Sequence, residues 1–194
     1  MLLGLTGGSG CGTSTAGAVL EKAGFYFVDA DQVYRELLTD DPSLRNALTE
    51  RFGMQILRDG VVDRKALAAI VFADAAALAD LNKITHTAII AEVDRRIASS
   101  GAKNAAVEAI ALIESGMADS CDAVVSVLSN YDVRLQRIMA RDGLPEDAAR
   151  ARLDAQKPDE FFIDNSDYVL NNNGSLSELE QGVQTLLQVL KELL

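Results

Sequence analysis

Small residues are gathered near the start of the chain in a segment whose chemistry suits phosphate. The segment follows the apolar residues 2–5 and consists of Gly7, Gly8, Ser9, Gly10, Cys11, Gly12, Thr13, Ser14 and Thr15. Glycines allow close approach of the backbone, so that successive N–H groups can point at one anion. A helix that begins at Ser14 would add the positive end of its dipole. The pattern predicts a nucleotide phosphate site in which the Ser14 hydroxyl can ligate Mg²⁺.

One position departs from the general pattern G-x-x-x-x-G-K-[ST]. Gly7, Gly12 and Ser14 are in register, but Thr13 stands where the lysine is expected. That lysine normally reaches the transferring phosphates, and its loss costs about 3 kcal/mol, or a hundredfold in rate, unless another cation replaces it. The alternative interpretation of the motif alone is a strand-to-helix turn that binds nothing, with Cys11 as a small filler.

Two aspartates follow the second apolar segment, residues 25–28. A carboxylate near an acceptor hydroxyl can orient it and accept its proton, and ligands of parallel sheets bind where the strands end. Asp31 is therefore the candidate catalytic base, unless it only caps a helix beginning at Gln32. Asp29 is a candidate for substrate binding or for holding the neighbouring loop.

Arg137 and Arg141 are spaced so that both lie on one face of a helix. They are candidates for closing over nucleotide phosphates, and one of them, or Lys157, is a candidate replacement for the missing cation. The alternative is a solvated charged face paired with Asp142 or Glu146.

His86 and Glu114 are the remaining candidates. His86 is the single histidine of the chain, and we interpret it as a packing or substrate-side residue rather than a catalytic one. Glu114 is expected after the third strand, at the ligand-facing edge, where it can contact substrate or a Mg²⁺-bound water. A charge at a helix N-terminus is the alternative for Glu114.

The elements that must position these residues alternate in the manner of βαβ units, which predicts an α/β fold with a parallel sheet buried on both faces. Five strands are expected at residues 2–5, 25–28, 105–112, 123–128 and 168–170. Helices are expected at residues 14–23, 32–39, 42–52, 64–72, 75–99, 131–141, 145–156 and 177–193.

Two helical stretches interrupt this alternation within one predicted domain. Residues 32–100 appear almost entirely helical and are too long for a simple crossover, which indicates a helical substrate-binding insert. Residues 131–163 have the size of a lid, and the remainder forms the nucleotide-binding core.

Composition excludes several classes of protein. Of the 194 residues, 48% are hydrophobic and 24% charged, which is typical of a globular domain. A net charge of −11 argues against nucleic-acid or membrane partners. Two cysteines are too few for a disulfide framework, Met1 leads directly into an apolar strand, and no apolar run approaches the roughly 18 residues that span a bilayer. We expect a cytoplasmic protein, whose oligomeric state the sequence leaves open.

Seven motifs along the chain occur in a characteristic order. They are Leu5-Thr6-Gly7-Gly8 with the following glycines, Asp29-Ala30-Asp31, Gly60 to Phe72, Leu81 to His86, Leu112-Ile113-Glu114, Arg137 to Gln156, and Ser166 to Gly174. Together they resemble the dephospho-CoA kinase family over essentially the whole chain. The departures are Thr13 for lysine, Thr87 and Ile110 for prolines, and a missing Glu-Lys pair after Gln156.

The resemblance implies a three-layer P-loop NTPase fold and ATP-dependent phosphorylation of the ribose 3′-hydroxyl of dephospho-CoA, with Mg²⁺. This is the last step of coenzyme A biosynthesis. The resemblance also implies that Asp31 is the catalytic base and that Arg137 and Arg141 are the arginines of the lid. The alternatives are a degenerate relative that binds nucleotide or a CoA-like ligand without turnover, and a kinase for another small hydroxyl compound.

Overall fold

A computed structural model describes residues 1–193 of the chain, with side chains through Lys191. The contacts divide the chain into two compact units. The core unit consists of Met1–Phe27 and the chain from Ala102 onward, and the insert unit is Val28–Gly101. Each unit has a hydrophobic core of its own.

A five-stranded sheet forms the centre of the core unit, in the order β2-β5-β1-β6-β7. The strands are β1 (Leu2–Thr6), β2 (Tyr26–Asp29), β5 (Ala105–Glu108), β6 (Ala123–Leu128) and β7 (Tyr168–Asn171). β1 pairs in parallel with both β5 and β6, and β6 pairs in parallel with β7. Every residue of β6 is buried, as expected for a continuous apolar strand covered on both faces. The predicted α/β class with a five-stranded parallel sheet is confirmed.

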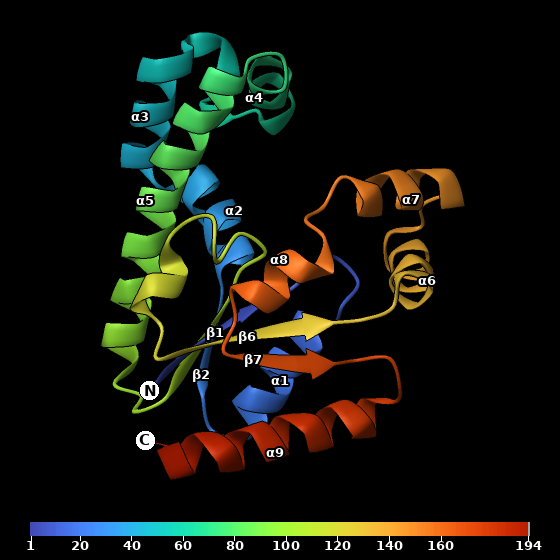
Figure 1. The fold of residues 1–194 in the computed structure, drawn as a ribbon. Coiled ribbons are helices and arrows are strands. Elements are labelled where there is room, and N and C mark those ends of the chain that lie inside the picture. Colours follow the sequence, from blue (N-terminus) through green and yellow to red (C-terminus); the bar gives the residue numbers. More distant parts are fainter. Residues whose placement is uncertain (194) are drawn as a thin grey trace. The chain divides into compact units, whose positions relative to one another are not determined.

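Helices cover both faces of this sheet (Figure 1). α1 (Thr13–Lys22) and α9 (Leu176–Leu193) pack against one another on one face, and α8 (Asp159–Asp164) lies on the other. α6 (Tyr131–Asp142) and α7 (Glu146–Asp154) pack together, and a short 3₁₀ turn, η2 (Met117–Ser120), precedes β6. One apolar face of α9 is buried in the core. Its buried residues are Leu179, Val183, Leu186, Leu187 and Leu190.

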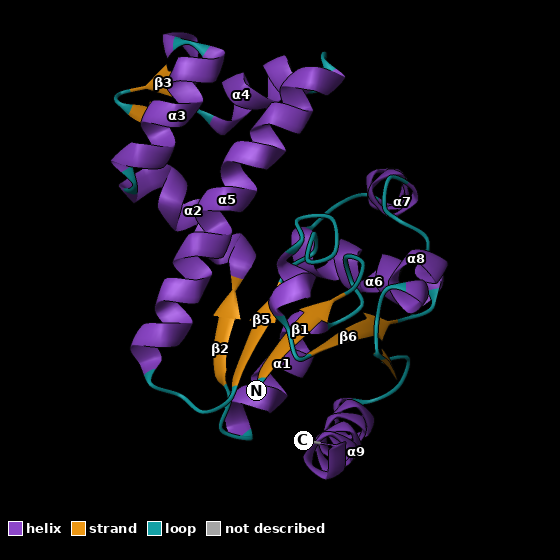
Figure 2. Ribbon diagram, turned by 60° about the vertical axis from the view of Figure 1, so that its left-hand side comes forward, coloured by secondary structure: helices purple, strands orange, loops and turns teal. Residues whose placement is uncertain are grey.

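The insert unit is built from four helices and a small hairpin (Figure 2). Its elements are α2 (Ala30–Asp40), α3 (Pro42–Phe52), η1 (Met54–Ile56), β3 (Leu57–Arg58), β4 (Val61–Val62), α4 (Arg64–Val71) and α5 (Ala75–Ser100). An aspartate begins each helix, because its side chain accepts a hydrogen bond from a first-turn N–H that has no partner within the helix. These aspartates are Asp29, Asp41, Asp63 and Asp74.

The β3–β4 hairpin lies between the helices predicted at residues 42–52 and 64–72, where no element was predicted. Asp59 and Gly60 form its turn with positive φ angles of 52° and 79°. Two residues with positive φ are what a tight two-residue hairpin turn requires, and Asp-Gly is a favoured pair there. The local turn chemistry therefore explains why the chain reverses here.

Several predicted boundaries also need correction. The third strand was expected to reach residue 112, but β5 ends at Glu108 and turns follow. The helix expected at residues 145–156 ends at Asp154, and α8 was not predicted because six residues are too few to show a helical period. α2 begins at Ala30 rather than Gln32. The other predicted elements differ from the observed ones by a residue or two at their ends.

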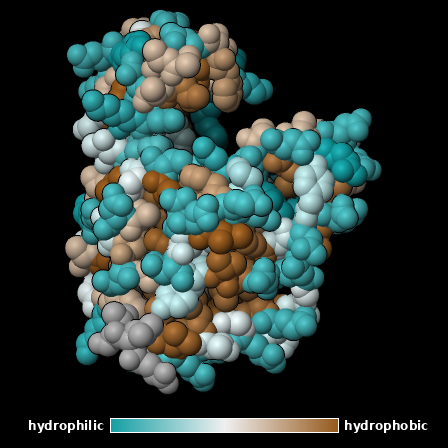
Figure 3. All heavy atoms as spheres, in the orientation of Figure 1, coloured by the Kyte–Doolittle hydropathy of each residue, from teal (hydrophilic) through white to brown (hydrophobic). Residues whose placement is uncertain are grey.

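The surface of the core unit carries hydrophobic side chains over the β6–β7 edge of the sheet (Figure 3). Ile163 of α8 and Val169 of β7 are 46% and 38% exposed. Within residues 1–193, no helix combines the length and hydrophobicity that crossing a lipid bilayer requires.

Candidate functional site

The glycine-rich segment forms the loop between β1 and α1, where its prediction placed it. Gly12 has a φ of 94° and immediately precedes α1 without a side-chain cap, so the first N–H groups of that helix are left for another acceptor. A Cβ at Gly12 would overlap Nδ2 of Asn172, which donates to the Cys11 carbonyl. Glycine is therefore required at position 12 by both conformation and space. A helix N-terminus with this geometry can bind an anion.

The two hydroxyls at the start of α1 converge on one carboxylate. The hydroxyl of Thr13 and the hydroxyl of Ser14, the latter at 2.9 Å, both donate to Oε1 of Glu108. Glu108 ends β5, and its backbone is paired with Leu5 of β1, which leads into the loop. The parallel register of the two strands thus carries an acidic side chain to the loop. Ser14 and Thr15 are exposed, as residues that meet a ligand must be.

Glu108 is a site residue that the sequence analysis missed. Extending the third strand to residue 112 moved the expected acidic edge residue to Glu114. In the structure Glu114 is exposed in a turn six positions beyond the end of β5. Leu112 is fully buried under Gly4, which explains why the chain turns inward after the strand. The sequence did contain a signal for Glu108, because it is a single acidic residue at the end of an apolar run.

Three arginines of α6 lie along the loop. Arg137 Nη1 donates to the carbonyl of Gly10 at 3.2 Å and to Ser129 Oγ at 3.1 Å. Arg141 Nη2 reaches Ser9 Oγ at 3.3 Å, but the same guanidinium forms two hydrogen bonds with the Asp142 carboxylate. Both predicted arginines therefore lie at the loop, and the predicted pairing with Asp142 is also present.

The third arginine, Arg134, was not predicted to contribute. Its side chain is only 7% exposed, and its Nε donates to the carbonyl of Ser9 at 3.1 Å. It was missed because only the contact with the loop distinguishes it from other helical arginines. Lys157, a candidate replacement cation, has its ammonium over the ring of Phe161, 5.0 Å from the centroid.

Cys11 is fully buried in the loop. Burial is the main influence on its thiol and raises the pKa, while the positive charge of Arg134 acts in the opposite direction. A thiol with a raised pKa is a poor nucleophile at neutral pH, which agrees with the interpretation of Cys11 as a small filler.

The remaining candidates lie in the insert unit. Asp29 Oδ1 accepts a hydrogen bond from Gln32 N at 2.9 Å, so Asp29 is the cap of α2. The alternative in which Asp31 caps this helix is wrong, because Asp31 belongs to the first turn. Partial loss of hydration raises the pKa of the Asp31 carboxyl, the charge of Asp29 raises it further, and Arg35 opposes the shift. His86 is half-buried on α5.

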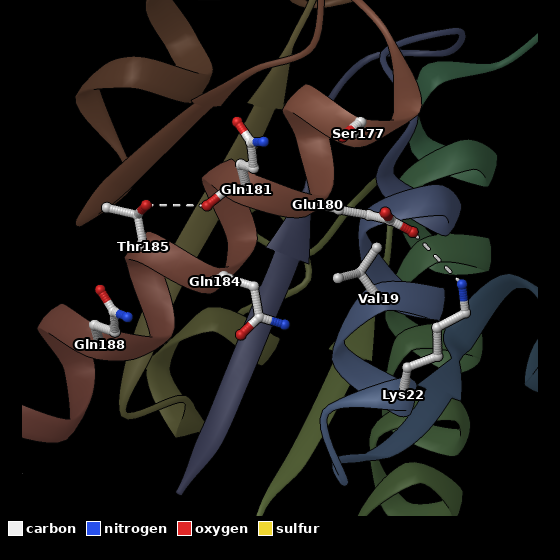
Figure 4. Close-up of a pocket in the computed structure, with 8 residues that line it drawn as sticks. All are labelled: Val19, Lys22, Ser177, Glu180, Gln181, Gln184, Thr185 and Gln188. Carbon is white, nitrogen blue, oxygen red and sulfur yellow. Dashed lines mark hydrogen bonds and ion pairs between the residues drawn. The ribbon is translucent and has the colours of Figure 1, made fainter.

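Two grooves formed by the described residues have a different chemistry from that of the loop. The groove in Figure 4, of about 560 Å³, lies between α1 and α9 and is crossed by the ion pair of Lys22 Nζ and Glu180 Oε1 at 3.5 Å. A groove of about 420 Å³ on the insert unit is bordered mainly by apolar residues of α3 and α5. Among the described residues, no three His, Cys, Asp or Glu side chains are grouped so that they could hold a metal. The phosphate loop is therefore the candidate site.

Comparison with known proteins supports the same reading. The model of a protein family described as dephospho-CoA kinase matches residues 1–178. A dephospho-CoA kinase from Corynebacterium glutamicum is 39% identical over 189 residues, which cover 95% of this chain and 97% of the relative.

Solved structures agree in fold. A crystal structure of a Thermus thermophilus protein has a TM-score of 0.83 and 29% identity, covering 98% of this chain and 97% of the other. Dephospho-CoA kinase from Campylobacter jejuni has a TM-score of 0.69 and 27% identity, with the same coverage of both chains. With the family match extending over most of its length, this chain belongs to the dephospho-CoA kinase family.

Proposed function

We propose that this chain transfers the γ-phosphoryl group of ATP to the ribose 3′-hydroxyl of dephospho-CoA and so completes coenzyme A. The observation that carries the proposal is the phosphate loop with Ser14 and Glu108 joined at its helical end, 2.9 Å apart. Family membership supplies the acceptor, because the relatives that cover nearly the whole chain are dephospho-CoA kinases.

The loop and α6 both contribute to binding of the nucleotide phosphates. Backbone N–H groups and the N-terminal dipole of α1 attract the phosphate oxygens from one side. Arg137 and Arg141, already in contact with Gly10 and Ser9, supply positive charge from the other. Residues 131–163 are proposed to act as the lid that carries these arginines, and closing it would exclude water from the transferring group.

Ser14 and Glu108 fit the protein half of a Mg²⁺ site. A hydroxyl and a carboxylate are hard oxygen ligands, and Mg²⁺ typically takes one or two protein ligands and completes its shell with phosphate oxygens and water. This donor set agrees with the lack of a larger acidic cluster among the described side chains. When bound, the ion neutralises charge that develops on the phosphates.

Asp31 is proposed to orient the acceptor hydroxyl and remove its proton. Its pKa is raised by partial burial and by the charge of Asp29, in the direction that makes a carboxylate a better proton acceptor. Asp29 and His86 of the insert unit and Glu114 of the core unit are proposed to bind the substrate. The lack of nucleic-acid and membrane partners and a cytoplasmic location remain predictions from composition.

The test is mass-spectrometric detection of CoA formed from dephospho-CoA and Mg·ATP. We expect the native chain to form CoA and Asp31→Asn to lose about a hundredfold or more in kcat, because a positioned base contributes that much. Asp94→Asn, an exposed aspartate of α5, is the matched control and is expected to keep native activity. Nucleotide binding without CoA formation would contradict the proposed reaction, and full activity of Asp31→Asn would contradict the assigned base.

A further inference from the structure

We propose that Arg134 provides the fixed positive charge that the phosphate loop lacks because Thr13 stands in place of a lysine. Arg134 thereby sets the affinity of the loop for nucleotide phosphates. The inference rests on the proposed function, because it concerns the same loop. It assigns a binding role to a residue outside the phosphate-loop motif.

Arg134 is fixed against the loop by contacts from three of its nitrogens. Nε donates to Ser9 O at 3.1 Å, Nη2 to Gln156 Oε1 at 2.6 Å, and Nη1 to Asp159 Oδ1 at 3.3 Å. Gln156 Oε1 also accepts from Ser9 N at 2.9 Å. Both backbone groups of Ser9 are thus held by one network, which ties the connection between α7 and α8 to the loop.

The loop sequence accommodates this side chain. A Cβ at Gly8 would overlap Nη2 of Arg134 and lie 2.8 Å from Oε1 of Gln156. A Cβ at Gly10 would lie 2.9 Å from the Arg134 carbonyl oxygen. Glycines at these two positions therefore allow the guanidinium and the start of α6 to lie directly against the loop backbone.

The charge of Arg134 is directed more to the loop than to its carboxylate partner. The guanidinium stays protonated at any physiological pH, and it is 7% exposed. Asp159 is 44% exposed, so water screens its attraction, whereas little water separates the guanidinium from Ser9. Both charges act on the pKa of the Cys11 thiol: that of Arg134 lowers it and that of Asp159 raises it, and the influence of Arg134 is the larger of the two.

Arg134 is held through three of its nitrogens, whereas the hydrogen bonds of Arg137 described here all come from its Nη1. Residues 134, 137 and 141 share a helix face because they are three and four positions apart. The guanidinium of Arg141 is 57% exposed and bonded to Asp142, and Arg137 has its Nη1 on Gly10 and Ser129. We therefore assign binding of the ground-state phosphates to Arg134, with little effect on the chemical step.

Calorimetric titration of ADP into the full chain tests the assignment without requiring turnover. We expect Arg134→Gln to weaken ADP binding about tenfold or more, because it removes a charge-assisted contact, and Arg134→Lys to recover part of the loss. Asp159→Asn should tighten binding severalfold by removing the opposing charge. Lys22→Gln, which removes an exposed cation of α1 in the same unit, is the control and should bind as the native protein does.

A double-mutant cycle distinguishes an electrostatic role of Arg134 in nucleotide binding from a merely structural one. In the Thr13→Lys protein the loop has its own cation, so Arg134→Gln should then cost less than about threefold. Equal losses in both backgrounds, or weaker binding by Asp159→Asn, would overturn the inference. If Arg134→Gln does not fold, as judged by circular dichroism, the Arg134→Lys and Asp159→Asn results decide. A native chain that binds no ADP would overturn the proposed function as well, whereas native binding that no Arg134 variant changes would overturn this inference alone.

Discussion

Replacing Glu108 with glutamine removes the negative charge beside Ser14 and leaves the shape of the side chain nearly unchanged. Two hydroxyls donate to Oε1 of this carboxylate. A hydrogen bond to a charged group contributes about 1.5–3 kcal/mol and a neutral one about 0.5–1.5 kcal/mol. Because the amide oxygen can still accept, and because Ser14 is exposed, we expect Glu108→Gln to lower the free energy of unfolding by about 1–2 kcal/mol.

The expected effect on catalysis is larger than the effect on stability. If Glu108 helps to hold Mg²⁺ at the phosphates, loss of its charge should lower kcat by about a hundredfold or more, as expected for one lost electrostatic contact to a transition state. The Mg²⁺ concentration that gives half-maximal activity should rise. CoA formation followed by mass spectrometry over a range of Mg²⁺ concentrations measures both quantities, and urea unfolding followed by circular dichroism measures stability.

Glu178→Gln is the matched control for this prediction. Glu178 also accepts two hydrogen bonds at the start of a helix in the core unit, from the backbone N and the hydroxyl of Ser175. Its replacement perturbs the cap of α9 but leaves the phosphate loop intact. The reasoning is refuted if Glu108→Gln lowers activity no more than Glu178→Gln does, or if the Mg²⁺ dependence is the same in both.

Two further predictions concern stability. Leu48 is fully buried in the core of the insert unit, so Leu48→Ala should lower the free energy of unfolding by about 2–5 kcal/mol in urea titrations; a loss below about 1 kcal/mol would contradict the described packing. Hydrogen bonds from Arg95 and then Arg96 lower the pKa of Glu92 from its ordinary 4.5 to about 2. The unfolded chain therefore binds the proton more readily, so this contribution is complete above pH 4.5 and is lost as the pH falls towards 2. Glu92→Gln should flatten the fall in stability over that interval, and an unchanged slope would contradict the described pairing.

Local chemistry explains why much of the fold could be predicted. The loop from Gly7 to Thr15 was located correctly because glycine conformations, a preceding apolar strand and a following helix are all properties of neighbouring residues. The same holds for β6 and for α3, whose predicted bounds match the structure. The hairpin at Asp59-Gly60 carried a local signal as well, but no strands were predicted beside it.

Pairing between distant segments decided the rest of the site. Glu108 lies 95 positions from Thr13, and it reaches the loop only because β5 and β1 align in parallel with their ends at the same edge. A strand predicted four residues too long was enough to select Glu114 instead.

The sequence by itself determined the phosphate loop, the α/β class and the family resemblance, because each depends on residue types at short or regular spacing. Only the tertiary structure decided which charges surround the loop. Arg134 and Ser9 are 125 positions apart, and their contact depends on the start of α6 lying against Gly10. No periodicity along the chain encodes that approach, since the energy of a buried charge depends on the three-dimensional environment that surrounds it.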